Sequence, residues 1–182
     1  MHVIIAGTAR SGKTTLALMM NEFGFTHYKM DSIKRGIFEL FKLKNDKWES
    51  VSPLMCNIIN KIIQDNKTDT NYNLEKYLFD TPFIYPSDIE KIDTSETLVI
   101  FLGYAHISLE EEMKLIREND KSHYWTTKIS DEVLREWTIE NIEYSKFLEN
   151  ECKRLNIKYF DTSTDRDNVL EEAKKYILEN SK

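Results

Sequence analysis

Near its amino terminus the chain reads Gly7-Thr8-Ala9-Arg10-Ser11-Gly12-Lys13-Thr14, which has the spacing G-x-x-x-x-G-K-T of a phosphate-binding loop. The apolar run Val3-Ile4-Ile5-Ala6 comes directly before it, and apolar residues at helical spacing follow it. Backbone N–H groups around the two glycines can wrap a phosphate chain, and the positive end of the following helix favours its negative charge. The order of strand, loop and helix therefore predicts a site for the phosphates of a nucleotide.

Two side chains of this loop have predicted roles of their own. Lys13 is expected to reach the β- and γ-phosphates, and the Thr14 hydroxyl is expected to coordinate Mg²⁺. The other positions expected to contact the nucleotide are the rest of the loop and the residue after it, namely Gly7, Thr8, Ala9, Arg10, Ser11, Gly12 and Thr15.

Length and charge narrow the class of protein. With 182 residues the chain has the size of a single domain, 1–182. Its net charge is −6, from 31 acidic and 25 basic residues, so sequence-independent binding to nucleic acid is not expected. Any site for an anion must therefore be local.

The cysteines and the hydropathy pattern indicate the environment. Cys56 and Cys152 lie far apart and form no C-x-x-C motif, which indicates buried or free thiols in a reducing compartment. No segment approaches the ~20 consecutive apolar residues of a membrane helix, and the first strand begins directly after Met1-His2. We therefore expect a cytoplasmic protein without a membrane partner, either a monomer or a homodimer.

Apolar runs of strand length alternate with helical patterns along the chain. Strands are predicted at residues 2–7, 26–30, 77–80, 97–102 and 157–161. A capping box of Ser108 and Glu111 is predicted to begin one of the helices between them. This alternation predicts an α/β fold with a parallel sheet covered on both faces.

Three of the predicted strands lead to an aspartate: Asp31, Asp80 and Asp161. Open parallel sheets bind ligands beyond the carboxyl ends of their strands, so these carboxylates are expected near the phosphate loop. Asp80 is suited to hold a metal-bound water, and Asp31 is suited to accept a proton or hydrogen bond from an attacking hydroxyl. The alternative for each is a turn residue or a helix N-cap, and this alternative is favoured for Asp161. It is weakest for Asp31, because Ser32 could itself cap the next helix and Arg35 would line the same cavity.

The chain resembles the small P-loop kinases, the group of nucleoside monophosphate kinases and shikimate kinase-like enzymes, in the loop at 7–14, residues 30–35, Asp80 and residues 161–163. The resemblance spans nearly the whole chain in the order of its parts. It implies a three-layer fold with a parallel five-stranded sheet in the order 2-3-1-4-5 and helices on both faces. It also implies that Asp31 contacts the phosphoryl acceptor, that Arg35 binds the anionic group of that acceptor, and that Thr162 and Ser163 lie against adenine.

The same resemblance implies a lid-like insertion at about residues 104–130. Lids of these kinases usually carry two or more arginines that clamp the transferred phosphoryl group. Here Arg117 is the candidate clamp, and the alternative is that it belongs to a solvated helix face. Tyr124 and Trp125 in the same region either stack on a ring of the ligand or anchor the loop. Specificity for the acceptor is expected from residues about 35–75, which carry no motif.

These observations predict ATP- and Mg²⁺-dependent transfer of the γ-phosphoryl group to a small acceptor, such as a nucleotide, a nucleoside or a small metabolite. Lys13, Asp31 and Arg117 are the predicted catalytic residues, and Thr14 and Asp80 are predicted to hold the metal. The alternative is an ATP-binding switch or slow NTPase that acts through a protein partner.

Overall fold

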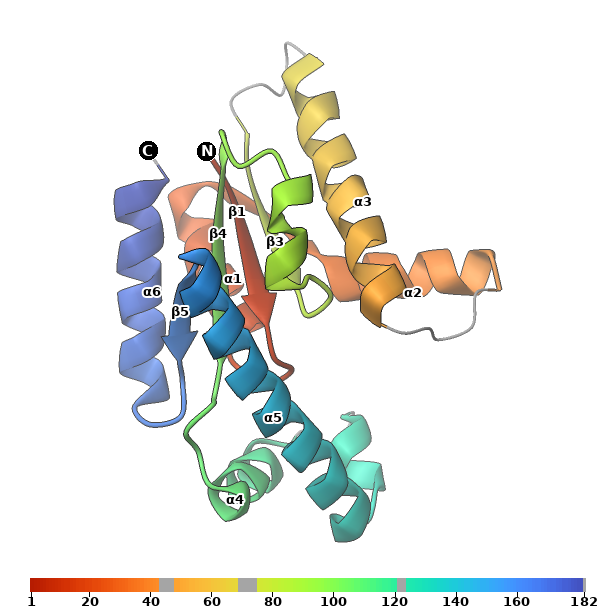
Figure 1. Ribbon diagram of the computed structural model, residues 1–182, viewed down its shortest axis with the longest axis vertical. Helices are drawn as coiled ribbons and strands as arrows, with labels where there is room; N and C mark the ends of the chain where they lie inside the picture. Colours follow the sequence, from red (N-terminus) through yellow and green to blue (C-terminus); the bar gives the residue numbers. More distant parts are fainter. Residues whose placement is uncertain (43–47, 69–74, 121–123, 182) are drawn as a thin grey trace.

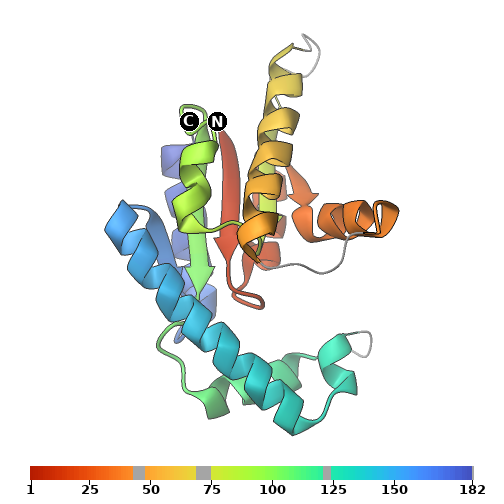
Figure 2. The same cartoon turned by 45° about the vertical axis from the view of Figure 1, so that its right-hand side comes forward.

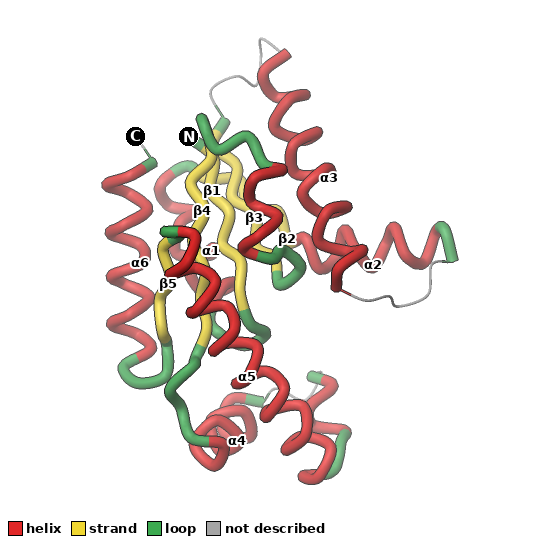
Figure 3. Tube along the Cα trace, in the orientation of Figure 1, coloured by secondary structure: helices red, strands yellow, loops and turns green. Residues whose placement is uncertain are grey.

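A computed structural model describes residues 1–42, 48–68, 75–120 and 124–181 of the chain. The strands pair in parallel in the order β2-β3-β1-β4-β5, which confirms the predicted order (Figure 3). They are β1 (His2–Gly7), β2 (Phe25–Lys29), β3 (Lys76–Thr81), β4 (Thr97–Gly103) and β5 (Lys158–Asp161).

Helices connect the strands and lie on both faces of the sheet (Figure 1). The α-helices are α1 (Lys13–Met20), α2 (Met30–Leu40), α3 (Trp48–Thr68), α4 (Leu109–Asn119), α5 (Asp131–Leu155) and α6 (Arg166–Asn180). Short 3₁₀-helices are η1 (Asn21–Phe23), η2 (Pro86–Lys91) and η3 (Trp125–Lys128). The arrangement confirms the three-layer α/β fold.

Alternate residues of β1 belong to two separate hydrophobic cores. Ile4 and Ala6 pack with residues of α3, η2 and α5, whereas Val3 and Ile5 pack with residues of α1 and α6. All four side chains are fully buried. Burial on both faces explains why β1 is continuously apolar instead of alternating between apolar and polar residues.

The second strand ends one residue earlier than predicted. Lys29 is both the last residue of β2 and the N-cap residue of α2, so Met30 already begins the helix. The prediction that Ser32 caps this helix is wrong, because Ser32 lies inside it. Met30 is fully buried in the core, and this packing fixes the start of the helix without a side-chain cap. Asp31 consequently lies in the first helical turn, where the helix dipole favours a carboxylate.

Residues 104–120 and 124–130, which we call the lid, lie beyond the carboxyl ends of the strands (Figure 2). The predicted capping box is present at the start of α4: Ser108 Oγ accepts from the Glu111 N–H, and the Glu111 carboxylate accepts from the Ser108 N–H. Helix α4 packs against α5, which runs for 25 residues from the lid back to the sheet. One continuous helix therefore joins the lid to the core.

The cysteines are as expected. Cys56 and Cys152 are both buried free thiols, and burial raises the pKa of each to about 12.

Among the helices that the structure describes, none combines the length and the apolar character needed to cross a membrane.

Candidate nucleotide site

The backbone of the phosphate loop requires glycine at two positions. Gly7 has a φ of +129°, and a Cβ atom there would lie 1.9 Å from the carbonyl oxygen of Leu102. Gly12 has a φ of +99° and is the N-cap residue of α1. Residues with a side chain rarely adopt these conformations. The motif glycines are therefore explained by the path of the chain, which leaves β1 close to β4 and turns into α1.

Contacts from β4 and α5 hold this loop. The hydroxyl oxygens of Thr8 and Ser145 lie 2.7 Å apart, and the Thr8 N–H donates to the Leu102 carbonyl at 3.0 Å. The Tyr104 hydroxyl donates to the Ala9 carbonyl at 2.9 Å. The loop is thus shaped by contacts within the protein.

Lys13 is buried, and its ammonium group donates to the Thr8 carbonyl. The pKa of Lys13 is lowered to about 8, chiefly by burial and also by the charge of Arg166, while the carboxylates of Asp80 and Asp31 act to raise it. A phosphate beside this ammonium group would restore the charge stabilisation that burial removes. The electrostatics therefore fit the predicted phosphate contact.

The Thr14 hydroxyl donates to Asp80 Oδ2 at 2.5 Å, and Nε2 of His27 lies 3.6 Å from the same oxygen. Burial raises the pKa of the Asp80 carboxyl, but His27, the charge of Lys13 and the Thr14 hydroxyl together lower it by more. The net pKa lies below its usual value. Asp80 is therefore an ionised carboxylate beside the motif hydroxyl, as a residue that holds a metal-bound water must be.

A cavity of about 800 Å³ opens beside the loop, between the lid and the start of α6. Its walls include Arg10 and residues 12–15 of the loop and α1, Glu112, Leu115 and Tyr124 of the lid, and Thr162, Thr164 and Arg166 after β5. The volume is within the roughly 300–1,000 Å³ typical of ligand sites. The cavity thus places the phosphate loop and the predicted adenine-binding segment around one space.

Besides Lys13, the charged residues that line this cavity include two arginines and one buried glutamate. Arg166 donates to the Arg10 carbonyl at 2.6 Å. Glu112 is only 6% exposed, and burial raises its pKa to about 7, although the charges of Arg166 and Arg10 lower it. The cavity therefore contains a carboxyl group whose charge changes near neutral pH.

Asp31 and Arg35 form an ion pair on α2, with Arg35 Nη2 at 3.5 Å from Asp31 Oδ2. Both side chains are exposed, at 43% for Asp31 and 68% for Arg35. They belong to the β2 side of the sheet and are not among the residues that line the 800 Å³ cavity. The Asp31 charge nevertheless acts on Lys13, whose pKa it raises. The pair thus lies on a different side of the phosphate loop from the cavity.

Arg117 is engaged inside the lid. Its guanidinium donates to the carbonyls of Thr126 at 2.6 Å and Ile129 at 3.2 Å, and to Asp131 Oδ1 at 2.6 Å. It is not among the residues lining the cavity. These contacts fasten α4 to η3 and to the start of α5, a different arrangement from the solvated helix face considered from the sequence.

The residues predicted at the end of β5 and just after it differ in their contacts. Asp161 accepts from the backbone N–H groups of Ala105 and Ser163, both at 2.8 Å, as expected for a turn residue. Thr162 lines the cavity, whereas the Ser163 hydroxyl accepts from the His106 N–H at 2.9 Å. Of the two predicted adenine contacts, Thr162 lines the cavity and Ser163 does not.

The two neighbouring aromatic residues of the lid, Tyr124 and Trp125, have different surroundings. Trp125 is half exposed and packs edge-on against Trp137 of α5, with ring centroids 5.3 Å apart. Tyr124 lines the cavity, and the Arg10 guanidinium lies 5.2 Å from the centroid of its ring. Trp125 therefore packs against α5, whereas Tyr124 lines the cavity.

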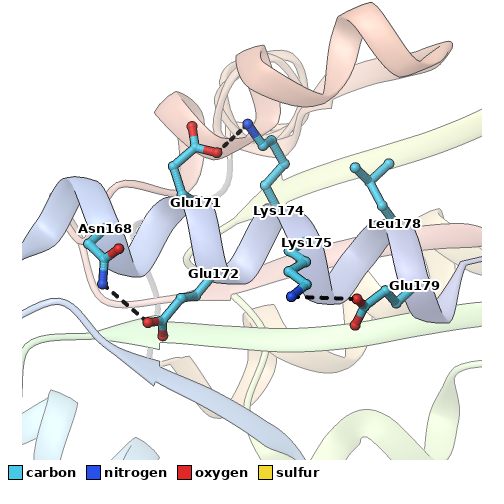
Figure 4. A pocket seen from close by; sticks show the side chains of 7 residues that line it. All are labelled: Asn168, Glu171, Glu172, Lys174, Lys175, Leu178 and Glu179. Atoms are coloured by element: carbon cyan, nitrogen blue, oxygen red, sulfur yellow. Dashed lines mark hydrogen bonds and ion pairs between the residues drawn. The ribbon is translucent and has the colours of Figure 1, made fainter.

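A second hollow, of about 490 Å³, runs along α6 (Figure 4). Its polar side chains interact within the helix: Lys175 with Glu179 at 4.0 Å, Asn168 with Glu172 at 3.2 Å, and Lys174 with Glu171. Such pairs three and four residues apart are ordinary features of a helix surface. This hollow contains no predicted site residue.

The sequence did not single out His27, Tyr104, Glu112 or Arg166. Arg166 carried a positional signal, because it follows the predicted adenine-binding segment within a few residues. His27 and Tyr104 carried none, since their partners Asp80 and Ala9 come from other elements.

Comparison with known proteins gives a clear result only at the level of structure. No protein family model matches the sequence, and no curated protein sequence matches it. A gluconokinase from Sinorhizobium meliloti 1021 matches with a TM-score of 0.58 at 12% identity, over 99% of this chain and 93% of that chain. A sugar kinase from Janibacter sp. HTCC2649 matches with a TM-score of 0.60 at 14% identity, over 99% and 95% of the two chains.

A dephospho-CoA kinase from Campylobacter jejuni matches with a TM-score of 0.50 at 14% identity, over 99% of this chain and 96% of its own. The chain has the small P-loop kinase fold. Because the identities are 12–14%, the likeness establishes the P-loop kinase fold alone, and residue roles rest on the geometry described above.

Proposed function

We propose that this protein is a kinase that transfers the γ-phosphoryl group of ATP to a small-molecule acceptor with the help of Mg²⁺. The observation that carries the proposal is the hydrogen bond from Thr14 to Asp80, because it joins the motif hydroxyl to an ionised carboxylate on the neighbouring strand. The likeness to solved kinases supports it.

The nucleotide is proposed to bind between the lid and α6. Lys13 and the loop N–H groups hold the β- and γ-phosphates, and the Arg10 and Arg166 side chains add positive charge to the same cavity. The nucleoside occupies the space toward Thr162 and Thr164, with Ser163 as a further predicted contact. Closing this space against water favours transfer to the acceptor over hydrolysis.

The oxygen donors present fit Mg²⁺. This ion prefers hard oxygen ligands and keeps several waters, and a hydroxyl with one nearby carboxylate is typical of its sites in kinases. Thr14 and Asp80 would hold it, and when bound it neutralises charge on the phosphates. The protein's own contribution is to keep Asp80 ionised, through its lowered pKa beside His27 and Lys13.

The acceptor is proposed to bind on the β2 side of the loop. Asp31 orients the acceptor hydroxyl and accepts its hydrogen bond, and Arg35 binds an anionic group of the same molecule. Arg117 remains the predicted clamp for the transferred group. We further propose that the protein acts in the cytoplasm as a monomer or a homodimer.

The test is acceptor-dependent formation of ADP. Purified protein with ATP and Mg²⁺ would be offered gluconate, a panel of sugars, dephospho-CoA, nucleoside monophosphates and shikimate in separate reactions. We expect ADP to form rapidly with one class of acceptor and slowly without it. ATP binding without stimulation by any acceptor in a metabolite pool would favour the alternative, an ATP-binding switch or slow NTPase that acts through a protein partner.

A further inference from the structure

Arg10 has a backbone conformation that needs an explanation. Its φ is +65°, in the left-handed region, where a residue other than glycine is disfavoured. The other described non-glycine residues with positive φ are Lys42, two residues after the end of α2, and Asn156, the C-cap residue of α5. Left-handed residues commonly end helices. Arg10 instead lies in the middle of the phosphate loop, so its side chain must contribute something that glycine would not.

That side chain reaches the lid. Arg10 Nη2 forms an ion pair with Asp120 Oδ1 and donates to the Ile116 carbonyl at 3.3 Å. The same guanidinium lies over the ring of Tyr124. All three partners belong to residues 104–130, and the bond from Arg166 to the Arg10 carbonyl fixes the backbone from the opposite wall of the cavity.

Asp120 is a suitable anchor within the lid. It is the C-cap residue of α4, and its carboxylate is 5% exposed. Its Oδ1 also accepts from the Thr126 hydroxyl at 2.6 Å, and its Oδ2 lies 3.9 Å from Arg117 Nη1. The Asp120 carboxylate thus joins α4 to η3, and Arg10 attaches this junction to the phosphate loop.

The Arg10 guanidinium also lines the cavity proposed for the nucleotide and is 23% exposed. A polyphosphate chain bound in the loop carries more negative charge than one carboxylate and is a natural bidentate partner for arginine. We infer that the Arg10–Asp120 ion pair is a latch between the phosphate loop and the lid, and that nucleotide phosphates compete with Asp120 for Arg10. The inference rests on the proposed phosphate site and adds to it a link between nucleotide binding and release of the lid.

The decisive variant is Asp120→Asn, which keeps the shape of the side chain and removes the competing charge. The probes are inorganic tripolyphosphate, ATP and adenosine, with affinities measured by calorimetry. If the latch exists, Asp120→Asn binds tripolyphosphate and ATP about fivefold more tightly, the equivalent of one partly exposed ion pair, and binds adenosine unchanged. In an Arg10→Gly background the same substitution gives no gain.

Two matched controls separate competition from general loosening of the lid. Asp131→Asn removes the carboxylate to which Arg117 donates hydrogen bonds, and Thr126→Val removes the other hydrogen bond to Asp120; both leave the Arg10 and Asp120 side chains in place. Neither should tighten tripolyphosphate binding. Trp125 and Trp137 report the lid in a Trp48→Phe background, where release should change their fluorescence in Asp120→Asn.

An Asp120→Asn variant with unchanged or weaker affinity for tripolyphosphate would overturn the latch while leaving the proposed kinase intact. The same gain in Asp131→Asn, or in the Arg10→Gly background, would overturn it as well, because the gain would then come from loosening. If the wild-type protein binds neither tripolyphosphate nor ATP, the phosphate site itself is wrong, and the latch is overturned with it.

Discussion

Thr14 and Asp80 come from different elements, α1 and β3, yet the threonine hydroxyl donates to the aspartate carboxylate at 2.5 Å. The parallel pairing of β1 with β3 sets this distance, because Asp80 is the register partner of Ile5, two residues before the loop begins. Because Asp80 is bonded to the motif hydroxyl, a substitution of Asp80 should change the Mg²⁺ concentration that the protein needs for activity.

Asp80→Asn and Asp31→Asn make a matched pair that separates metal from acceptor. Asp80→Asn should raise the Mg²⁺ concentration needed for half-maximal activity, because a neutral amide holds a metal-bound water poorly. Asp31→Asn should leave ATP and Mg²⁺ binding within a few-fold of wild type and lower turnover by ~10² or more, as for loss of a positioned base. Initial rates at varied Mg²⁺ and acceptor measure both. Near-full turnover by Asp31→Asn would mean that Asp31 serves only the helix terminus.

Lys13→Met should separate nucleotide binding from stability. Replacing the ammonium group should weaken ATP binding by about 100-fold, because a charged hydrogen bond to phosphate contributes up to about 3 kcal/mol. The folded-state pKa of about 8 lies below the usual 10.5, so at neutral pH the buried charge opposes folding. Thermal unfolding at pH 7 should therefore show no loss of stability. Unchanged ATP affinity in the folded variant would rule out this site.

Glu112→Gln should change how stability depends on pH. The pKa of Glu112 is about 7 in the folded protein against 4.5 ordinarily, so the folded protein retains a proton that the unfolded chain releases. The free energy of unfolding should therefore fall as pH rises from about 4.5 to about 7. Relative to wild type, Glu112→Gln should gain about 3 kcal/mol at pH 8 and nothing at pH 4. Urea unfolding at both pH values measures this, with the exposed Glu110→Gln as the control that should show no such gain.

The Arg117→Ala variant tests whether Arg117 stabilises the lid or binds the transferred phosphoryl group. Loss of its hydrogen bonds to two carbonyls and Asp131 should lower the free energy of unfolding by about 1–3 kcal/mol. Asp131→Asn should lower it in the same direction, because it removes one of those partners. Steady-state kinetics in parallel decide the second role: a fall in turnover of ~10² in Arg117→Ala, without a similar fall in Asp131→Asn, would establish the clamp.

Much of the fold was predictable because the signals are local. The five strands were predicted with ends that differ by at most one residue, since apolar runs between helical patterns depend only on neighbouring residues. The start of α2 was not predictable in this way, because it depends on the burial of Met30 in the core. The strand order came from resemblance and was confirmed.

The phosphate loop could be identified from local sequence alone. Gly7 and Gly12 adopt positive φ angles that only glycine accepts readily, and Lys13 and Thr14 follow them at fixed spacing, so motif and conformation are tied together within eight residues. Which charged groups come into contact, in contrast, depends on tertiary packing. Arg10 pairs with Asp120 across 110 residues of sequence, Asp80 meets His27 from another strand, and Arg117 donates to the Thr126 carbonyl within the lid. These pairings depend on how the lid and the strand ends pack together, and the spacing of residues along the chain carries no information about that packing.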